Sequence, residues 1–290
     1  MSLPEEQTLY HSLEGQVAIV TGAAQGIGRA IVERLASAGA TTLAADHNEE
    51  LVREMAAATS SRGAEVIPYV VDVTDEAAVC GLVDAACGRS GRLSILVNNA
   101  GISTVGLIED VSIADWQRVL DVNLTGPFIT CKSVVPVLRA GGGGKIVNVA
   151  SVAAKRISAN MAASYTASKA GLLAFTRHLA YETAPWRINV NAICPGPVAS
   201  PMLYRTGDVD ERVARLTSTI PVGRLTTPED QANAVLFLCS PLADMITGVA
   251  LDIDGGALLG WEPVSGYLAR HGIAAPSADS RGDTVDETAL

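Results

Sequence analysis

Tyr165 and Lys169 are the residues whose types and spacing point most directly to chemistry. They lie four positions apart, so a helix would place the phenol and the ammonium on one face. Hydride transfer to or from a carbonyl needs a group that gives or takes the proton of the oxygen. A phenol can do this near neutral pH when a nearby cation favours the phenolate. The pair therefore predicts an acid/base site for hydride transfer.

Three further polar positions are candidates for the same site. Ser151 directly follows a strand-like segment over 145–150, where its hydroxyl could hold a substrate oxygen. The stretch from Asn98 to Gly101 ends another strand, and its amides could order a loop beside a cofactor. Asn123 lies inside a helical pattern, where an amide is unfavourable unless its side chain has a partner. Local capping is the alternative at each of these positions.

Three glycines follow the first predicted strand with the spacing GxxxGxG. Gly22, Gly26 and Gly28 stand where that strand turns into a helix. A tight turn without Cβ atoms lets backbone N–H groups approach a pyrophosphate, and the helix N-terminus adds about half a positive charge. The spacing differs from the GxGxxG fingerprint of dinucleotide-binding folds. The prediction of a pyrophosphate site therefore rests on the position of these glycines directly after the first strand.

Acidic residues end the second and third predicted strands. Asp46 lies eighteen positions after Gly28, where a carboxylate can accept hydrogen bonds from ribose hydroxyls and repel a 2′-phosphate. The sequence therefore favours NAD over NADP. The alternative is that Asp46 caps a helix starting near Asn48. Asp72 and Val73 follow the third strand, where they could contact the edge of the cofactor's adenine. Asp72 could equally be an acidic residue that stabilises a turn.

Hydrophobic patterning indicates the elements that would position these residues. Near-continuous Val/Ile runs alternate with helical patterns, which is typical of a doubly wound, Rossmann-like α/β fold with helices on both faces of a parallel sheet. Seven strands are predicted, over Val17–Val20, Thr42–Ala45, Val66–Val71, Ile95–Val97, Ile146–Val149, Ile188–Ala192 and Val249–Ile253. Six helices are predicted, over Ile27–Ala38, Glu49–Thr59, Glu76–Cys87, Ala114–Leu138, Ser164–Glu182 and Pro228–Leu238.

Breakers and caps give the boundaries of these elements. Thr74 and Thr227 precede acidic first turns and are expected to cap helices, while Gly39 and Gly63 suit helix ends. No linker divides the central region, so we expect an N-terminal extension over 1–14 and one domain over 15–261. Residues 200–224 form a candidate lid, with an ordinary surface helix as the alternative. The segment 262–290 is expected to be a flexible tail or to pack on a neighbouring subunit.

Composition excludes several classes of protein. The 21 basic and 31 acidic residues give a net charge of −10 without basic runs, which argues against nucleic acid as a partner. No apolar run is long enough to span a bilayer and the first residues do not resemble a signal peptide, so we expect a cytoplasmic protein. The five cysteines and four histidines lack metal-ligand spacing. We therefore expect buried free thiols and no metal.

Together these motifs resemble the short-chain dehydrogenase/reductase family over nearly all of residues 15–256. The resemblance extends to a segment that looks like the family's Pro-Gly stretch beside the nicotinamide, Pro195 to Met202, and to the glycine turn. The matching motif residues are Thr21, Gly22, Gly26 and Gly28, then Asn98 to Gly101, and the catalytic set Asn123, Ser151, Tyr165 and Lys169.

The resemblance implies a role for each residue of that set. Tyr165 would be the acid/base, Ser151 would position the substrate oxygen, and Lys169 would bind the nicotinamide ribose and lower the tyrosine pKa. Asn123 would hold a water in a proton relay. The expected cofactor-binding set is Thr21, Gly22, Gln25, Gly26, Ile27, Gly28, Asp46, Asp72, Val73, Asn99, Ala100, Gly101, Tyr165, Lys169, Pro195, Gly196, Val198, Ser200 and Met202.

One spacing departs from the family pattern. Ser151 and Tyr165 are one position further apart than is usual, which an extra loop residue explains. Ser164 is the less favoured substitute for Ser151, because a neighbouring helix position points elsewhere.

The side chains that the resemblance places near the reacting atom are mostly apolar, and none is an Arg or Lys that would bind a carboxylate or phosphate. They are Val152, Ala153, Ile157, Pro197, Met202 and Leu203. We expect an NAD-dependent oxidoreductase acting on a neutral, partly apolar secondary alcohol or ketone. The alternatives are an NADPH-dependent 3-oxoacyl-thioester reductase and a non-catalytic dinucleotide-binding protein. The resemblance further implies a homotetramer or homodimer formed through the helices around Trp116 and Tyr165–Tyr181.

Overall fold

The computed structural model describes residues 12–60, 64–158, 161–200, 209–260 and 262–274. Within them, seven strands form one sheet in the order β3-β2-β1-β4-β5-β6-β7, and every neighbouring pair is parallel. The doubly wound fold predicted from the sequence is confirmed. The strands are β1 (Gln16–Thr21), β2 (Thr41–Asp46), β3 (Val66–Val70), β4 (Arg92–Asn98), β5 (Gly144–Val149), β6 (Ile188–Pro195) and β7 (Ala250–Ile253).

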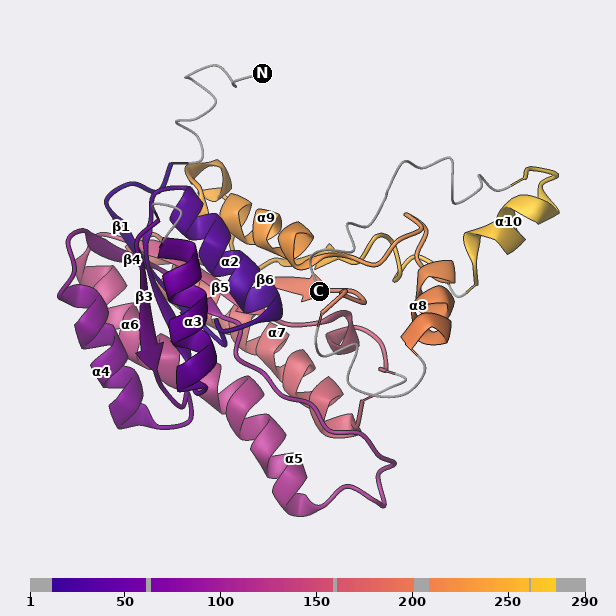
Figure 1. Cartoon of the computed structure of the whole chain (residues 1–290), viewed down its shortest axis with the longest axis horizontal. Helices are drawn as coiled ribbons and strands as arrows, with labels where there is room; N and C mark the ends of the chain where they lie inside the picture. Colours follow the sequence, from indigo (N-terminus) through magenta and orange to yellow (C-terminus); the bar gives the residue numbers. More distant parts are fainter. Residues whose placement is uncertain (1–11, 61–63, 159–160, 201–208, 261, 275–290) are drawn as a thin grey trace.

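Helices cover both faces of this sheet (Figure 1). The core on one face joins it to α2, α3 and α9, and the core on the other face joins it to α4, α6 and α7. The α-helices are α2 (Gly26–Ser37), α3 (Glu49–Ser60), α4 (Glu76–Cys87), α5 (Ile113–Leu120), α6 (Gly126–Ala140), α7 (Ala163–Thr183), α8 (Val209–Ser218), α9 (Pro228–Cys239) and α10 (Val264–Arg270).

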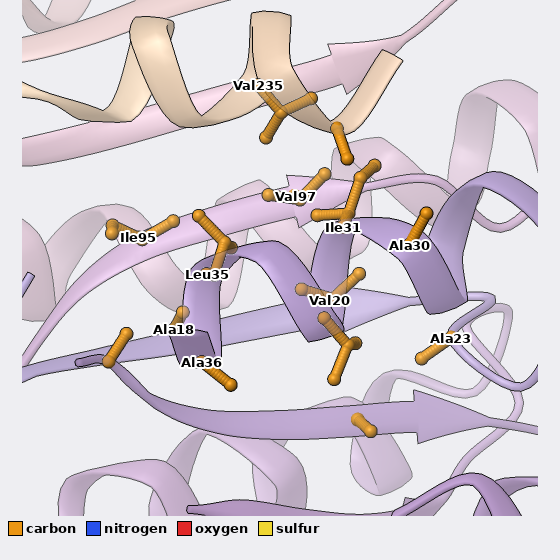
Figure 2. Packing of buried hydrophobic residues seen from close by; sticks show 14 of the residues in the cluster. Ala18, Val20, Ala23, Ala30, Ile31, Leu35, Ala36, Ile95, Val97 and Val235 are labelled. Carbon is orange, nitrogen blue, oxygen red and sulfur yellow. The ribbon is translucent and has the colours of Figure 1, made fainter. Parts of the chain in front are cut away.

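Alternation along each strand divides its side chains between the two cores. In β1, Ala18 and Val20 pack with α2 and α9, whereas Val17 and Ile19 face the opposite helices. Figure 2 shows Ala18 and Val20 beneath Ile31 and the neighbouring side chains of α2. Full burial of a Val or Ile side chain contributes roughly 1.5–3 kcal/mol, so the apolar runs predicted as strands are stable only between two helical layers.

The predicted helix over Ala114–Leu138 is interrupted. It consists of α5 and α6 joined by a π-helical turn over Asp121–Thr125, which carries Asn123. Turns of this kind occur frequently at functional sites. Periodicity does not reveal such a turn, because the apolar pattern continues through it.

The expected helix boundaries are correct in part. Thr227 caps α9 in a reciprocal capping box with Asp230. Gly39 has φ +96° just after α2, as a helix-ending glycine should. The expectation that Thr74 caps α4 is wrong, because the side chain of Asp75 accepts from the first-turn N–H groups. Gly63 lies outside the described residues.

The expected burial of all five cysteines is also wrong. Cys131, Cys194 and Cys239 are buried, but Cys80 and Cys87 are exposed. Both exposed thiols lie on α4, whose buried side is formed by other residues such as Val79 and Leu82. Amphipathicity of the helix therefore decides their position.

The segments predicted at the two ends and as a lid are described in part. Residues 1–11, 201–208 and 275–290 lie outside the described residues. The helix α8 falls in the candidate lid, and α10 forms in the segment where the sequence showed no clear period. In Figure 1, α8 and α10 lie on the opposite side of the molecule from β3 and α4. Among the described helices, none is both long enough and apolar enough to cross a membrane.

Candidate active site

The candidate residues gather at the carboxyl edge of the sheet. All strands point the same way, so the residues that end β1, β4, β5 and β6 meet at this edge. The order of the strands reverses beside β1, between its neighbours β2 and β4. Ligands bind at this kind of switch point in open parallel sheets.

The glycine turn between β1 and α2 is packed too closely for side chains. A Cβ on Gly22 (φ +63°) would lie 2.7 Å from Ala100 Cα, and one on Gly28 would lie 2.0 Å from Gly22 O. Gln25 is the N-cap of α2 but makes no side-chain capping bond, and no acidic residue occupies the first turn. This cradle fits the pyrophosphate of a dinucleotide, because the first-turn N–H groups of the helix have no side-chain cap.

Thr21 fastens this turn to the end of β4. Its hydroxyl accepts hydrogen bonds from the N–H groups of Asn99 and Ala100, both at 3.1 Å. The Asn99 amide donates to the carbonyls of Thr21 (3.0 Å) and Gly22 (2.8 Å). The two loops that border the switch point are thereby held as one unit.

Asp46 is buried at the end of β2. Its Oδ2 accepts from the N–H of Ala24 and its Oδ1 from that of Asn48, both at 3.0 Å, and His47 Nδ1 is 3.1 Å from Oδ1. The cap of α3 is Asn48, whose Oδ1 accepts from Leu51 N–H at 3.0 Å. The alternative that Asp46 caps this helix is therefore wrong. Its carboxylate connects the glycine turn to β2.

Asp72 is exposed just after β3 and forms a turn with Thr74. Its Oδ1 accepts from the Thr74 N–H (2.9 Å) and hydroxyl (2.7 Å). These hydrogen bonds lower the pKa of Asp72. Asp72 is therefore a turn residue, as the alternative interpretation of the sequence expected. The neighbouring Val73 is buried against Gly126.

Tyr165, Ser151 and Lys169 come together where β5 meets α7. The Tyr165 phenol forms a hydrogen bond with Ser151 despite the longer spacing. Lys169 Nζ donates to Val149 O at 2.8 Å and lies 5.9 Å from the centre of the Tyr165 ring. Ser164 is fully buried with its hydroxyl 3.2 Å from that of Thr104. Ser164 is thus occupied elsewhere, and Ser151 is the serine beside the phenol.

Asn123 in the π-helical turn joins the same group. Its Oδ1 accepts from Ile102 N–H at 2.8 Å, and its Nδ2 donates to Ile102 O (2.9 Å) and Ser168 Oγ (3.1 Å). A Cβ on Gly101 would lie 3.4 Å from both Asn123 Oδ1 and Lys169 Nζ. The amide therefore has the partners that its helical position requires, and Gly101 leaves room beside the ammonium.

The expectation that Lys169 lowers the pKa of Tyr165 is wrong for this structure. Burial raises the pKa of Tyr165, opposed by the hydrogen bond with Ser151. Burial also lowers the pKa of Lys169 to about 8. Loss of water disfavours the charged form of each group, so Tyr165 holds its proton at neutral pH.

The segment after β6 is fixed by Thr226. Thr226 donates from its N–H and its hydroxyl to Pro197 O, both at 3.0 Å, and pairs with Val198 in a bridge. Gly196 packs against Asp254, where a Cβ would lie 2.7 Å from Cα. Pro195 and Ser200 flank this part of the chain, and Met202 lies outside the described residues.

Sequence reasoning missed the residue that supports this segment. Gln231 on α9 is fully buried, and its Nε2 donates to Thr226 Oγ1 (3.2 Å) and Ile253 O (3.1 Å). Its Oε1 has no hydrogen-bond partner among the residues that the structure describes. A glutamine within an apolar helical face was the available signal, because a buried amide needs partners.

A buried polar chain behind the site was also missed. Asn98 accepts from the Thr130 hydroxyl (2.6 Å) and donates to Asn148 Oδ1 (2.9 Å), which in turn donates to the Thr176 hydroxyl (2.9 Å). The chain links α6, β4, β5 and α7 across the core. The signal was Asn148, a single amide within the apolar run of β5.

Known proteins match this chain over most of its length. A family model described as enoyl-(acyl carrier protein) reductase matches residues 22–257. A 3-oxoacyl-[acyl-carrier-protein] reductase of Thermotoga maritima is 38% identical over 248 residues, 85% of this chain and 99% of the relative. A D-threitol dehydrogenase of Mycolicibacterium smegmatis is 38% identical over 244 residues, 84% of this chain and 93% of the relative.

A solved structure is similar to this chain in both sequence and fold. It is that of a proposed NAD(P)-dependent gluconate 5-dehydrogenase of Beutenbergia cavernae with bound NADP at low occupancy. The two chains are 37% identical with a TM-score of 0.80, and the match covers 87% of this chain and 100% of the other. The matches together support a site for a nicotinamide dinucleotide.

The buried ammonium of Lys169 should make stability depend on pH. Its pKa is about 8 when folded against an ordinary value of 10.5, so between these values the unfolded chain binds more protons. Stability therefore rises with pH in this window. We expect the free energy of unfolding of the wild type, relative to Lys169→Met, to increase by roughly 2–3 kcal/mol from pH 7 to 10. Urea unfolding of both proteins across this range measures it, and parallel pH profiles would contradict it.

Proposed function

Because the chain belongs to the short-chain dehydrogenase/reductase family of oxidoreductases, we propose that it transfers hydride between NAD and a neutral, partly apolar secondary alcohol or ketone. The observation that carries the proposal is the pairing of the partly buried Tyr165 phenol with the buried Lys169 ammonium. Within the described residues, only one of the three ammonium donors of Lys169 has a hydrogen-bond partner, Val149 O. Two donors remain for a ligand, and their burial would make such contacts strong.

The cofactor residues proposed for this site follow the edge of the sheet. The uncapped start of α2 would hold the pyrophosphate, and the Asp46 carboxylate would hold the adenosine ribose. A dinucleotide bound here supplies the hydride acceptor or donor. The proposed set is Thr21, Gly22, Gln25, Gly26, Ile27, Gly28, Asp46, Asp72, Val73, Asn99, Ala100, Gly101, Tyr165, Lys169, Pro195, Gly196, Val198, Ser200 and Met202.

The catalytic roles proposed for this chain follow from the contacts around the phenol. Tyr165 holds its proton at neutral pH and gives it to the substrate oxygen in reduction. In oxidation the phenol would first release its own proton to water, and the resulting phenolate would take the proton of the alcohol. Ser151 shares a hydrogen bond with that phenol and would hold the same oxygen. Lys169 would orient the nicotinamide ribose. Asn123 would hold a water that carries the proton onward.

The runner-up is an NADPH-dependent 3-oxoacyl-thioester reductase, which the Thermotoga maritima relative favours. Asp46 argues against it, because a carboxylate at the ribose would repel a 2′-phosphate. The D-threitol dehydrogenase is equally identical to this chain and favours an alcohol. Comparing NADH formation from secondary alcohols with NADPH consumption on a 3-oxoacyl thioester distinguishes the two functions.

Replacement of the proposed acid/base gives the first test of mechanism. Tyr165→Phe should lower kcat by more than tenfold while NADH affinity stays within a few-fold, because only the proton-transfer group is removed. Tyr181→Phe is the matched control, since Tyr181 lies on the same helix but is 89% exposed. The measurements are alcohol oxidation rates and NADH titration by fluorescence. A Tyr165→Phe enzyme with more than a tenth of wild-type kcat would exclude Tyr165 as the acid/base.

Cofactor preference should depend on the charge of Asp46. A charge-assisted contact with both ribose hydroxyls is worth on the order of 1.5–3 kcal/mol. Wild type should therefore prefer NAD by more than a hundredfold, and Asp46→Ala should lower kcat/KM for NAD by roughly ten- to a hundredfold while NADP use rises.

Because Asp46 also accepts from Ala24, a second variant separates its charge from its structural contact. Asp46→Asn keeps the shape and an acceptor but removes the repulsion. It should raise the NADP/NAD ratio of kcat/KM, and adding His47→Arg should raise it further by pairing with the phosphate. Equal wild-type use of both cofactors, or an unchanged ratio in Asp46→Asn, would restrict Asp46 to holding the glycine turn.

We further propose that the enzyme is a homotetramer or homodimer formed through the helices around Trp116 and Tyr165–Tyr181, which are α5 with its continuation α6, and α7. On α6, Phe128 is half exposed and packs edge-on with Phe175 of α7, and Tyr181 further along α7 is exposed. Trp116 on α5 is only partly exposed. Light scattering should give a mass of at least twice 30.0 kDa at micromolar concentration. A monomeric mass would refute the proposal.

A further inference from the structure

Four large aliphatic side chains are exposed on the stretch that leads from β4 into the first residue of α5. Val105, Leu107, Ile108 and Ile113 are 69% to 83% exposed, and we call them the apolar rim. Isolated exposed aliphatic residues are ordinary, but four within nine positions form a patch. Figure 1 shows this segment reaching out from the body of the molecule before it returns to α5.

The apolar rim has a defined shape because both ends of its segment are anchored. Asp110 N–H donates to Leu107 O at 3.0 Å, which closes a turn around Ile108. At the far end, Ser112 caps α5 by accepting from Asp115 N–H at 3.0 Å. The aliphatic side chains are therefore displayed by ordered backbone.

The near end of the segment is fixed to the catalytic residues. Ile102 exchanges two hydrogen bonds with Asn123. Thr104 O accepts from Ala162 N–H at 2.8 Å, just before α7 and three positions from Tyr165. The apolar rim thus begins one residue beyond the contact that holds the start of the catalytic helix.

The charges beside the apolar rim indicate what it would accept. Glu109 and Asp110 are exposed in the same turn, and no basic residue lies between Asn98 and Asp115. An anionic group would be repelled there. An uncharged hydrocarbon would be favoured, because it would remove the aliphatic side chains from water.

We propose that the apolar rim binds the hydrocarbon part of the substrate that extends away from the reacting carbon, so that uncharged secondary alcohols with longer aliphatic chains are better substrates. This inference rests on the proposed function. Its occupant is an alkyl chain continuous with the alcohol at Tyr165. A methylene transferred out of water gains about 0.8 kcal/mol, which converts to about fourfold in kcat/KM for each fully buried group.

The experiment is a chain-length series with NAD, from 2-butanol to 2-octanol. For the wild type, kcat/KM should rise two- to fourfold per methylene. In the double variant Leu107→Ser, Ile108→Ser the rise should fall below 1.5-fold. Met245→Ser is the matched control and should keep the wild-type slope, since Met245 is 96% exposed and follows Asp244, which pairs with Lys145 at the start of β5. Thermal melting of each protein establishes that the variants are folded.

The other outcomes overturn the inference in distinguishable ways. Oxidation of 2-butanol with no gain along the series would overturn it and leave the proposed function intact. If the double variant keeps the wild-type increase in kcat/KM per methylene, the hydrocarbon binds to another surface. A double variant with a smaller mass by light scattering and the wild-type slope would make the apolar rim a subunit contact. No oxidation of any alcohol would overturn both proposals.

Discussion

Lys169 carries an ammonium into the interior of the protein, where it is only 4% exposed, and the arrangement of the site depends on how this group is accommodated. The carbonyl of Val149 accepts one of its protons and so fixes α7 to the end of β5. The cost of burial appears as a pKa lowered to about 8. Without a ligand, burying the Lys169 ammonium with unused donors costs folding free energy. Such a cost is expected where function and stability compete.

Two adjacent asparagines hold the elements around this charge in different ways. Asn98 ends β4 facing the core, where it joins the chain of hydrogen bonds to α6, β5 and α7. Asn99 is one residue further along and bonds to the glycine turn through Thr21 and Gly22. Because side chains alternate along an extended chain, one dipeptide fixes both α7 and the turn between β1 and α2. Neither amide depends on solvent for its partners.

The sequence predicted the parallel sheet and its helices well, because a strand covered on both faces must be almost wholly apolar. It also predicted that Ser151, Tyr165 and Lys169 meet, since one helix and the end of one strand suffice to place them. It failed where tertiary contacts decide. The π-helical turn at Asn123 has no periodic signature. The direction of the Tyr165 pKa shift depends on burial, which spacing alone does not reveal.

The division between the sheet and its outer loops explains why relatives of equal identity act on different substrates. The groups expected to perform chemistry are attached to strands and helices that share the central core. The part of the chain around α8 is built differently: α8 has no buried residue, and within the described residues it packs on a small separate cluster around Ile220, Leu225 and Ala257. Substitutions there disturb little packing, so the substrate can change while the proton-transfer residues stay in register. If the proposed function holds, overall identity reflects the reaction, whereas the segment beyond Thr104 and the surroundings of α8 would determine the substrate.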